Sequence, residues 1–324
     1  MSILVYTENW AGKFKKLSYE IVSFAAAIAK EMGSSVTALS IGHVADDELK
    51  SLGKYGANKV LNVQDDRFES LDNKALADAV AKAAESEGAK VIIFAHNNEG
   101  KAIAPRVSVK LNAGLVSGVT GLPVSVDPFV IRKKVFTGKA FANIQIKTEV
   151  KVITFAQNSY EVADNPADTV LEVFDPQIGD DEFNTVIKDT HKITGKVLLT
   201  DAEIVVSGGR GMKGPENWGG LEELGELLGA GMACSRPVSD EGWRSHEEHV
   251  GQTGKIIAPN LYIAFGISGA IQHLGGVNSS KFIVAINKDP EAPIFEASDY
   301  GIVGDAFKVI PQLIEAVKEM KANK

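Results

Sequence analysis

Short apolar runs alternate with amphipathic segments along the first half of the chain. Residues 3–6 form an apolar run, and after it apolar residues recur at helical spacing at Ile21, Ala25, Ile28 and Met32. The alternation continues with strand-like runs at 36–41, 59–63 and 91–95, and with helix-like segments at 46–53, 73–87 and 101–111. This pattern predicts a parallel sheet covered by helices.

The pattern changes between residues 124 and 156. The runs 130–136 and 147–152 mix charged residues with β-branched ones, which is typical of antiparallel edge strands. The polar stretch 175–195 has no strong period and predicts an inter-domain linker. We therefore expect an N-terminal α/β domain over residues 1–190, with a few antiparallel strands and this linker, and a second domain over 196–324.

A second α/β pattern begins with the apolar run 202–206 and ends with a helix in which Phe307, Ile310, Ile314 and Val317 line one face. The predicted fold class is thus α/β, with two Rossmann-like domains that each have a mostly parallel sheet flanked by helices. Glycines of the second domain cluster after its strands, at 208–211, 251–254 and 266–269. Ligands bind at the carboxyl ends of parallel strands, and glycine lets the backbone approach a pyrophosphate. The second domain, similar to flavodoxin or dinucleotide-binding sheets, is where we expect the functional site.

Composition narrows the classes of function. The 324 residues carry a formal net charge of -8, which gives no electrostatic basis for nonspecific binding to nucleic acid. The single cysteine, Cys234, excludes an intramolecular disulfide, and we expect it to serve packing. No apolar run approaches the roughly 20 residues of a membrane span, so we expect a cytoplasmic protein without membrane insertion.

Two glycine-rich segments could bind a cofactor. The segment 261–273 reads as a buried strand that turns through two glycines into a helix, but it lacks the G-x-G-x-x-G fingerprint. Close packing would explain it equally well. The segment 250–255 resembles a P-loop, yet His249 and Ile256 occupy positions where a Walker motif needs Gly and Ser or Thr. It is either a plain tight turn or a loop that points Gln252 and Thr253 into a ring-shaped ligand.

The remaining candidates are cationic or metal-binding side chains. His246 and His249 are three residues apart, whereas the zincin pattern needs four, so we interpret 246–249 as a solvated charged loop. Arg236 and His273 could favour the negative charge that a reduced flavin develops near N1 and O2. For each residue alone, a salt bridge or a helix-end contact is the more ordinary role.

Together, these segments resemble the C-terminal domain of electron transfer flavoprotein alpha subunits. The resemblance covers nearly all of residues 200–324 strongly, and the N-terminal half more loosely through 100–122. The matching segments are 206–211, 235–236, 240, 242–243, 250–255, 259, 261–273, 285–295 and 299–305.

The resemblance implies one non-covalent FAD per heterodimer, held by the C-terminal domain, with a beta subunit that binds AMP or a second FAD and packs on the N-terminal domain. Arg236 would lie against the isoalloxazine, Thr253 near N5 and His273 near O2. Ser268 would hold the ribityl and pyrophosphate region, and Asn287 the adenosine half. The full set implied is Arg210, Ser235, Arg236, Val250, Gly251, Gln252, Thr253, Ser268, Gly269, Ala270, Ile271, Gln272, His273, Asn287, Asp305 and Ala306.

The function implied is electron relay without substrate turnover of its own, so the chain would not be an enzyme. Flavin dehydrogenases, such as the acyl-CoA dehydrogenases of fatty acid beta-oxidation, would reduce the FAD. A membrane quinone oxidoreductase would accept the electrons through an anionic semiquinone that Arg236 and His273 stabilise. Three alternatives stay open: a nicotinamide-dependent dehydrogenase, a cofactor-free partner subunit, and an electron-bifurcating flavoprotein.

Overall fold

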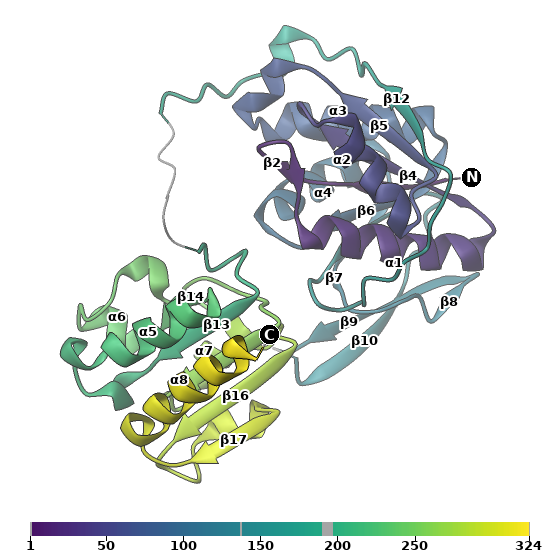
Figure 1. Ribbon diagram of the computed structural model, residues 1–324. Helices are drawn as coiled ribbons and strands as arrows, with labels where there is room; N and C mark the ends of the chain where they lie inside the picture. The colour runs from purple at the N-terminus through teal and green to yellow at the C-terminus, as the bar shows by residue number, and fades with distance from the viewer. Residues whose placement is uncertain (1, 137, 190–196, 324) are drawn as a thin grey trace. The chain divides into compact units, whose positions relative to one another are not determined.

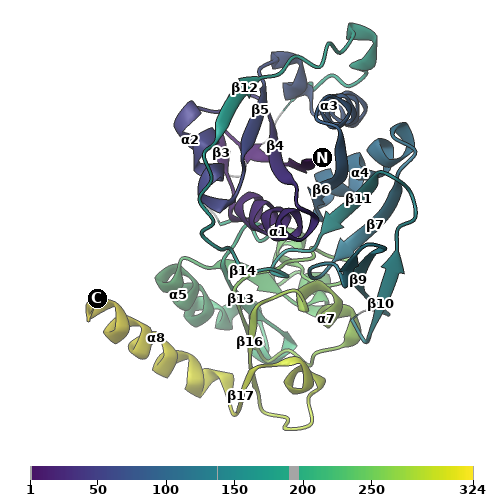
Figure 2. The same ribbon diagram turned by 90° about the vertical axis from the view of Figure 1, so that its right-hand side faces the viewer.

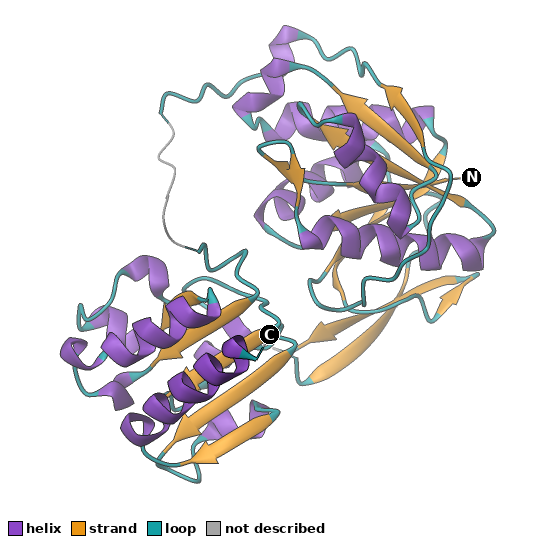
Figure 3. Cartoon of the chain, viewed as in Figure 1, coloured by secondary structure: helices purple, strands orange, loops and turns teal. Residues whose placement is uncertain are grey.

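The computed structural model describes residues 2–136, 138–189 and 197–323, which form two compact units, Met1–Thr190 and His191–Lys324 (Figure 1). Each unit has a mostly parallel sheet with helices against it, so the predicted α/β class is confirmed (Figure 3). The two units are described separately below.

The N-terminal unit has one large sheet in the order β10-β9-β7-β11-β6-β1-β4-β5-β12, with β8 paired to β9, and a small hairpin of β2 and β3. Its strands are β1 (Ser2–Tyr6), β2 (Asn9–Trp10), β3 (Lys13–Phe14), β4 (Ser35–Ile41), β5 (Lys59–Val63), β6 (Ala89–Ala95), β7 (Gly114–Val119), β8 (Ser125–Val126), β9 (Phe129–Val135), β10 (Ala140–Gln145), β11 (Lys151–Phe155) and β12 (Val170–Val173). Its helices are α1 (Lys16–Met32), α2 (Asp46–Ser51), α3 (Asn73–Ser86) and α4 (Asn98–Lys110), with 3-10 turns η1 (Leu52–Tyr55), η2 (Asp66–Ser70) and η3 (Asp180–Glu182).

Both faces of the central strands of this sheet, β11, β6, β1, β4 and β5, are buried. Successive side chains of a strand point to opposite faces, and accordingly Ile3 of β1 packs in one apolar cluster while Leu4 packs in the other. Helix α1 covers the first face through residues such as Phe24, and α3 and α4 cover the second (Figure 2). Two-sided burial explains why the strands read as continuous apolar runs.

One predicted strand of this unit is wrong. The run 147–152 was expected to form an antiparallel edge strand, but β11 begins only at Lys151 and lies parallel between β6 and β7. Its Val152, Ile153 and Phe155 are fully buried, so the strand belongs to the centre of the sheet. Of the charged residues that suggested an edge, Lys147 and Glu149 precede the strand and Lys151 begins it. In contrast, β9 is antiparallel to β10, as expected for 130–136.

The first part of the stretch 175–195 packs on the N-terminal unit. Ile178 is buried in its second apolar cluster, the Phe183 ring stands edge-on against Phe68, and the Asn184 amide donates to Asp72 at 2.9 Å. Residues 190–195 of the predicted linker lie outside the described residues.

The C-terminal unit has a five-stranded parallel sheet in the order β14-β13-β15-β16-β17. Its first face packs on α5 and α8, around Trp218 and Ile310, and its second face packs on α7, around Tyr262 and Val277. The strands are β13 (Ile204–Gly208), β14 (Gly231–Cys234), β15 (Leu261–Phe265), β16 (Phe282–Asn287) and β17 (Tyr300–Val303). The helices are α5 (Gly219–Leu228), α6 (Arg236–Asp240), α7 (Ile271–Val277) and α8 (Ala306–Ala322), with 3-10 turns η4 (Arg210–Met212), η5 (Pro215–Asn217), η6 (His246–Glu248) and η7 (Pro293–Ala297).

Candidate cofactor site

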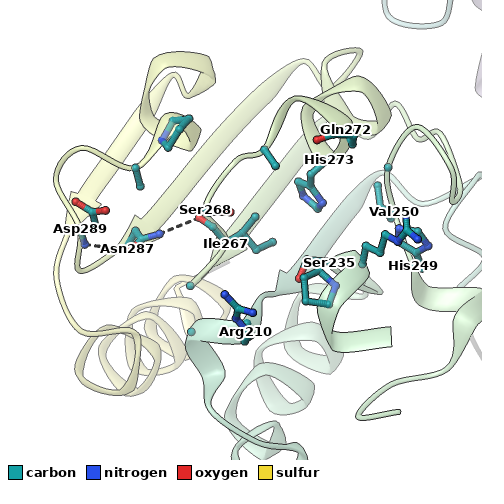
Figure 4. A pocket seen from close by; sticks show the side chains of 18 of the residues that line it. Arg210, Ser235, His249, Val250, Ile267, Ser268, Gln272, His273, Asn287 and Asp289 are labelled. Atoms are coloured by element: carbon teal, nitrogen blue, oxygen red, sulfur yellow. Dashed lines mark hydrogen bonds between the residues drawn. The ribbon is translucent and has the colours of Figure 1, made fainter. Parts of the chain in front are cut away.

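A cavity of about 670 Å³ opens at the carboxyl ends of the C-terminal sheet. This is the edge where parallel α/β sheets bind ligands, and the volume falls in the range of roughly 300–1,000 Å³ that is usual for ligand sites. The loops after β13, β14, β15 and β16 and the segment 249–253 form its walls. Asn287 and Asp289 lie at one end, and Val250 and His249 at the other (Figure 4).

Glycine backbone forms the floor, where the loops after β13 and β15 touch. The Gly211 amide donates to the Gly266 carbonyl at 3.0 Å, and a Cβ on Gly211 would come within 2.7 Å of the Gly266 Cα. Gly266 has φ +60°, a left-handed conformation that favours glycine. A side chain at either position would separate the loops, so the floor requires both glycines.

Two guanidinium groups line the cavity, those of Arg210 and Arg236. Both residues are exposed, and the Arg236 Nε contacts the Asp240 carboxylate at 3.2 Å across one turn of α6. Arginine keeps its charge at any physiological pH and binds phosphate and carboxylate oxygens well. The cavity therefore has fixed positive charge that could meet an anionic ligand.

His273 lies on α7 and is 7% exposed. Its Nε2 is 2.7 Å from the Tyr262 hydroxyl, and burial lowers the pKa of His273 from 6.5 to about 4. The imidazole is thus neutral at neutral pH in the cofactor-free chain. The cationic role expected for it would require the uptake of a proton, whereas Arg236 is charged at all times.

Hydrogen bonds fix the side chain of Asn287 at its end of the cavity. Asn287 ends β16 and donates through its Nδ2 to the Ile267 carbonyl at 2.8 Å, while its Oδ1 accepts from the Asp289 amide at 3.0 Å (Figure 4). These two bonds fix the amide between the loops after β15 and β16. Ser235 is 7% exposed and Ser268 is exposed at the cavity wall.

Most of the predicted site residues come together at this cavity. Those that line it are Arg210, Ser235, Arg236, Val250, Gly251, Thr253, Ser268, Ala270, Gln272, His273 and Asn287. The other predicted residues, which do not line it, are Gln252, Gly269, Ile271, Asp305 and Ala306.

The residues outside the lining have other contacts. Asp305 caps α8 by accepting from the Phe307 amide at 3.1 Å, and it pairs with Lys288 at 2.8 Å. Ala306 is the first residue of α8 and is buried in the apolar cluster around Trp218, and Gly269 packs closely on Ile294. Gln252 and Ile271 have exposed side chains next to the lining residues.

The sequence prediction missed several lining residues, and one of them was misinterpreted. The lining residues outside the predicted set are Gly211, Pro237, His249, Gly266, Ile267, Asp289, Ala292 and Pro293, of which Gly211, Gly266 and Ile267 belong to glycine clusters that the sequence did point to. His249 was expected in a solvated loop, but it is 3% exposed because its backbone forms a parallel bridge with Cys234 at the end of β14. Cys234 itself is fully buried, and burial raises the pKa of its thiol to about 12, which is consistent with a packing role.

The fold and the site define a class of protein: a parallel α/β sheet with a glycine-floored cavity at its carboxyl edge, lined by two arginines that suit an anionic ligand. The comparisons make this specific. Residues 3–177 match the model of the electron transfer flavoprotein domain, and residues 198–278 match that of the electron transfer flavoprotein FAD-binding domain. The chain belongs to the electron transfer flavoprotein family, as an alpha subunit, which confirms the resemblance seen in the sequence.

Curated relatives match along nearly their whole length. An electron transfer flavoprotein subunit alpha from Syntrophomonas wolfei is 38% identical over 97% of this chain and 98% of its own, and one from Bacillus subtilis is 34% identical over 99% and 98%. The acryloyl-CoA reductase electron transfer subunit beta of Anaerotignum propionicum is 32% identical over 98% and 96%. Within the described ranges, every helix is too short or too polar to cross a lipid bilayer.

The residues at the cavity fit a flavin dinucleotide. The glycine floor carries no side chains that would keep a pyrophosphate away from the backbone, and Arg210 and Ser268 line the same cavity with groups that bind phosphate oxygens. Two buried polar atoms of the cavity wall also lack an internal partner: among the described residues, nothing hydrogen-bonds to the Nδ1 of His249 or to the Nδ1 of His273. Buried polar atoms are nearly always paired, so an orphaned one in a cavity wall is consistent with a missing ligand.

Proposed function

We propose that this chain holds one FAD in the cavity of its C-terminal unit and carries electrons as half of a heterodimer with a beta subunit. The observation that carries the proposal is the glycine-floored cavity with Arg210 and Arg236 at its walls, in a chain whose C-terminal unit matches an FAD-binding family. The N-terminal unit packs on the beta subunit, which binds AMP or a second FAD.

The roles of the residues are those that the family resemblance implies, and the position of most of them at the cavity supports these roles. When bound, FAD supplies reversible electron uptake, one electron at a time. Arg236 offers a fixed positive charge to the ring, and Thr253 donates a hydrogen bond near N5 with Gln252 beside it. His273 lies on the O2 side. Arg210, Ser235 and Ser268 hold the ribityl and pyrophosphate region, and Asn287 orients the adenosine half with Asp305 near it.

A carrier needs binding and charge balance rather than a substrate acid or base, so the chain is not an enzyme with its own turnover. Flavin dehydrogenases such as acyl-CoA dehydrogenases reduce the cofactor, and a membrane quinone oxidoreductase oxidises it. The protein works in the cytoplasm. Its route in the cell is the electron flow that accompanies fatty acid oxidation.

A second direction of electron flow has support from one relative. The Anaerotignum propionicum protein, 32% identical, is named as an electron transfer subunit of acryloyl-CoA reductase. In this alternative, the reduced cofactor delivers electrons to a reductase of an unsaturated acyl-CoA. The same cavity would serve both directions, because only the docking partner differs.

Purification of the chain with its beta subunit tests the proposal. We expect a yellow complex that bleaches with dithionite and releases FAD, not FMN, on denaturation. One FAD per heterodimer supports a simple carrier with AMP in the beta subunit, and two support a bifurcating protein. A colourless complex that does not take up added FAD contradicts the proposal. Rates of flavin reduction by acyl-CoA dehydrogenase and of reoxidation by acryloyl-CoA reductase then separate the two directions.

A further inference from the structure

His249 is held firmly in the wall of the cavity. Its amide donates to the His246 carbonyl at 3.2 Å, its carbonyl accepts from the Lys255 amide at 2.9 Å, and its backbone pairs with Cys234. The side chain is buried, and it lines the cavity beside Val250 (Figure 4). This position places a second imidazole, besides His273, at the cofactor site.

The His249 ring packs under the turn that holds Thr253. A Cβ on Gly254 would lie 2.9 Å from the His249 Nδ1, and a Cβ on Gly251 would lie 3.5 Å from its Nε2. The ring therefore fills the space that these two glycines leave open. Its Nδ1, like that of His273, is buried without a hydrogen-bond partner among the described residues, so this nitrogen has no other hydrogen bond to lose when it takes up a proton.

The charged and titratable groups around His249 come from several elements. His246 lies on the solvent side, with its ring centroid 5.6 Å away and its own Nδ1 2.9 Å from the Ser239 hydroxyl. Arg236 and Asp240 act on it from α6, and His273 from α7. The neighbouring Glu248 carboxylate turns to Arg244, at 2.6 Å.

These surroundings keep His249 neutral while the cavity holds no added negative charge. Burial is the largest influence and lowers the pKa of His249 below its usual 6.5; His246 and Arg236 lower it further, and Asp240 opposes them. A negative charge placed in the cavity would act in the same direction as Asp240. It would favour the protonated ring, because opposite charges close together stabilise each other in a poorly solvated site.

We propose that His249 is the proton acceptor of the flavin site: it is neutral beside the oxidised cofactor and takes up one proton when the cofactor gains one electron. The inference rests on the proposed function. The electron comes from a reduced flavoprotein partner, and the proton comes from solvent on the side of the exposed His246. An O–H bond of a hydronium ion in the solvent breaks as an N–H bond forms on His249, so the positive charge gained by the imidazole balances the one negative charge that the electron adds to the cavity.

The proposal predicts a pH-dependent reduction potential that depends on His249. In the heterodimer, the reduction potential for the first electron should fall as the pH rises from 5.5 to 8.5. The equilibrium constant for this one-electron reduction should change by close to tenfold per pH unit, which corresponds to a slope of about 59 mV per pH unit. His249→Gln should flatten this slope. His246→Gln is the matched control, because the same change at the exposed neighbour leaves the acceptor in place and should keep the slope.

Each outcome decides a different claim. If His249→Gln keeps the slope of the wild type, the proton acceptor is another group, such as His273, and the proposal is overturned. If His249→Gln fails to hold FAD, NMR of the wild-type heterodimer with labelled histidine replaces it. The pKa of His249 should then rise on reduction, and an unchanged pKa contradicts the proposal. If the wild type holds no flavin at all, the proposed function itself fails.

Discussion

At the scale of single residues, the cavity combines a fixed charge with titratable groups. Arg236 is charged under all conditions, whereas His249 and His273 are kept neutral by burial. Both kinds of group can stabilise a cofactor that becomes more negative when it is reduced. Under our proposal, the fixed charge of Arg236 raises the reduction potential of the flavin at every pH, and the inducible charge of His249 makes that potential depend on pH.

Replacement of Arg236 by Ala should destabilise the one-electron-reduced flavin. The guanidinium is largely exposed and its pair with Asp240 contributes little to folding, so we expect the protein to remain folded. Photoreduction followed by absorbance should show less of the intermediate redox state than in the wild type. Asp240→Asn serves as the control, because it removes the same ion pair and leaves the positive charge. Undiminished accumulation in Arg236→Ala would contradict its role.

Burial of His273 predicts an acid-sensitive C-terminal unit. The pKa of His273 is about 4 in the folded chain and 6.5 when solvated, so between these values the unfolded chain binds more protons. The free energy of unfolding should therefore decrease as the pH is lowered, by about 2 kcal/mol from pH 7 to pH 5 for this one group. Denaturation of the apoprotein, followed through Trp218 and Trp243, measures it. His273→Gln should lose this part of the pH dependence; an equal dependence would refute the assignment.

At the scale of elements, the cavity depends on backbones that pack without side chains between them. Helix α7 approaches the segment 250–254 through Gly276, where a Cβ would lie 2.5 Å from the Gly251 Cα. This contact sets the position of the turn that holds Thr253. The floor between Gly211 and Gly266 follows the same principle.

Gly276→Ala should push the segment 250–254 away from α7. Overpacking of this kind typically costs about 1–3 kcal/mol, and we expect weaker FAD retention in addition. Gly219→Ala is the matched control, because it lies at the start of α5 with nothing within 4 Å of its added Cβ. Thermal unfolding and FAD release on dilution should change in the first variant and not in the second. Equal behaviour of the two variants would show that the contact is unimportant.

Local patterns predicted most of the strands and helices, because apolar runs and helical spacing depend on near neighbours. Strands β4, β5 and β6 and helices α3 and α4 lie close to their predicted ranges. Strand β11 was mistaken for an edge because the charged residues before it dominated the pattern. Its central place comes from pairing with β6 and β7, which are distant in the sequence.

Part of the site was predictable because its signals are also local in the sequence. The carboxyl-edge rule and the glycine clusters located it, and the family resemblance supplied residues such as Arg236 and Asn287. The burial of His249 was not predicted because its neighbours Glu247 and Glu248 are charged. His249 is buried because its backbone pairs with Cys234 at the end of β14. No local signal reveals that bridge. Asp289 and Pro293 reach the cavity through the shape of the loop after β16.

At the scale of the whole molecule, the two α/β units have different roles in our proposal. Each has its own apolar clusters, and each matches a different model of the same family. The cavity lies wholly within the C-terminal unit. The N-terminal unit is therefore left for association with the partner subunit in our account.

The central claim is that the cavity at the carboxyl edge of the C-terminal sheet holds FAD, and a crystal structure of the purified heterodimer tests it most directly. We predict density for FAD over the glycine floor, with the ring near Arg236, His249 and His273 and the adenosine half toward Asn287. An FAD bound elsewhere on the heterodimer, with this cavity empty or occupied by another ligand, would contradict the account.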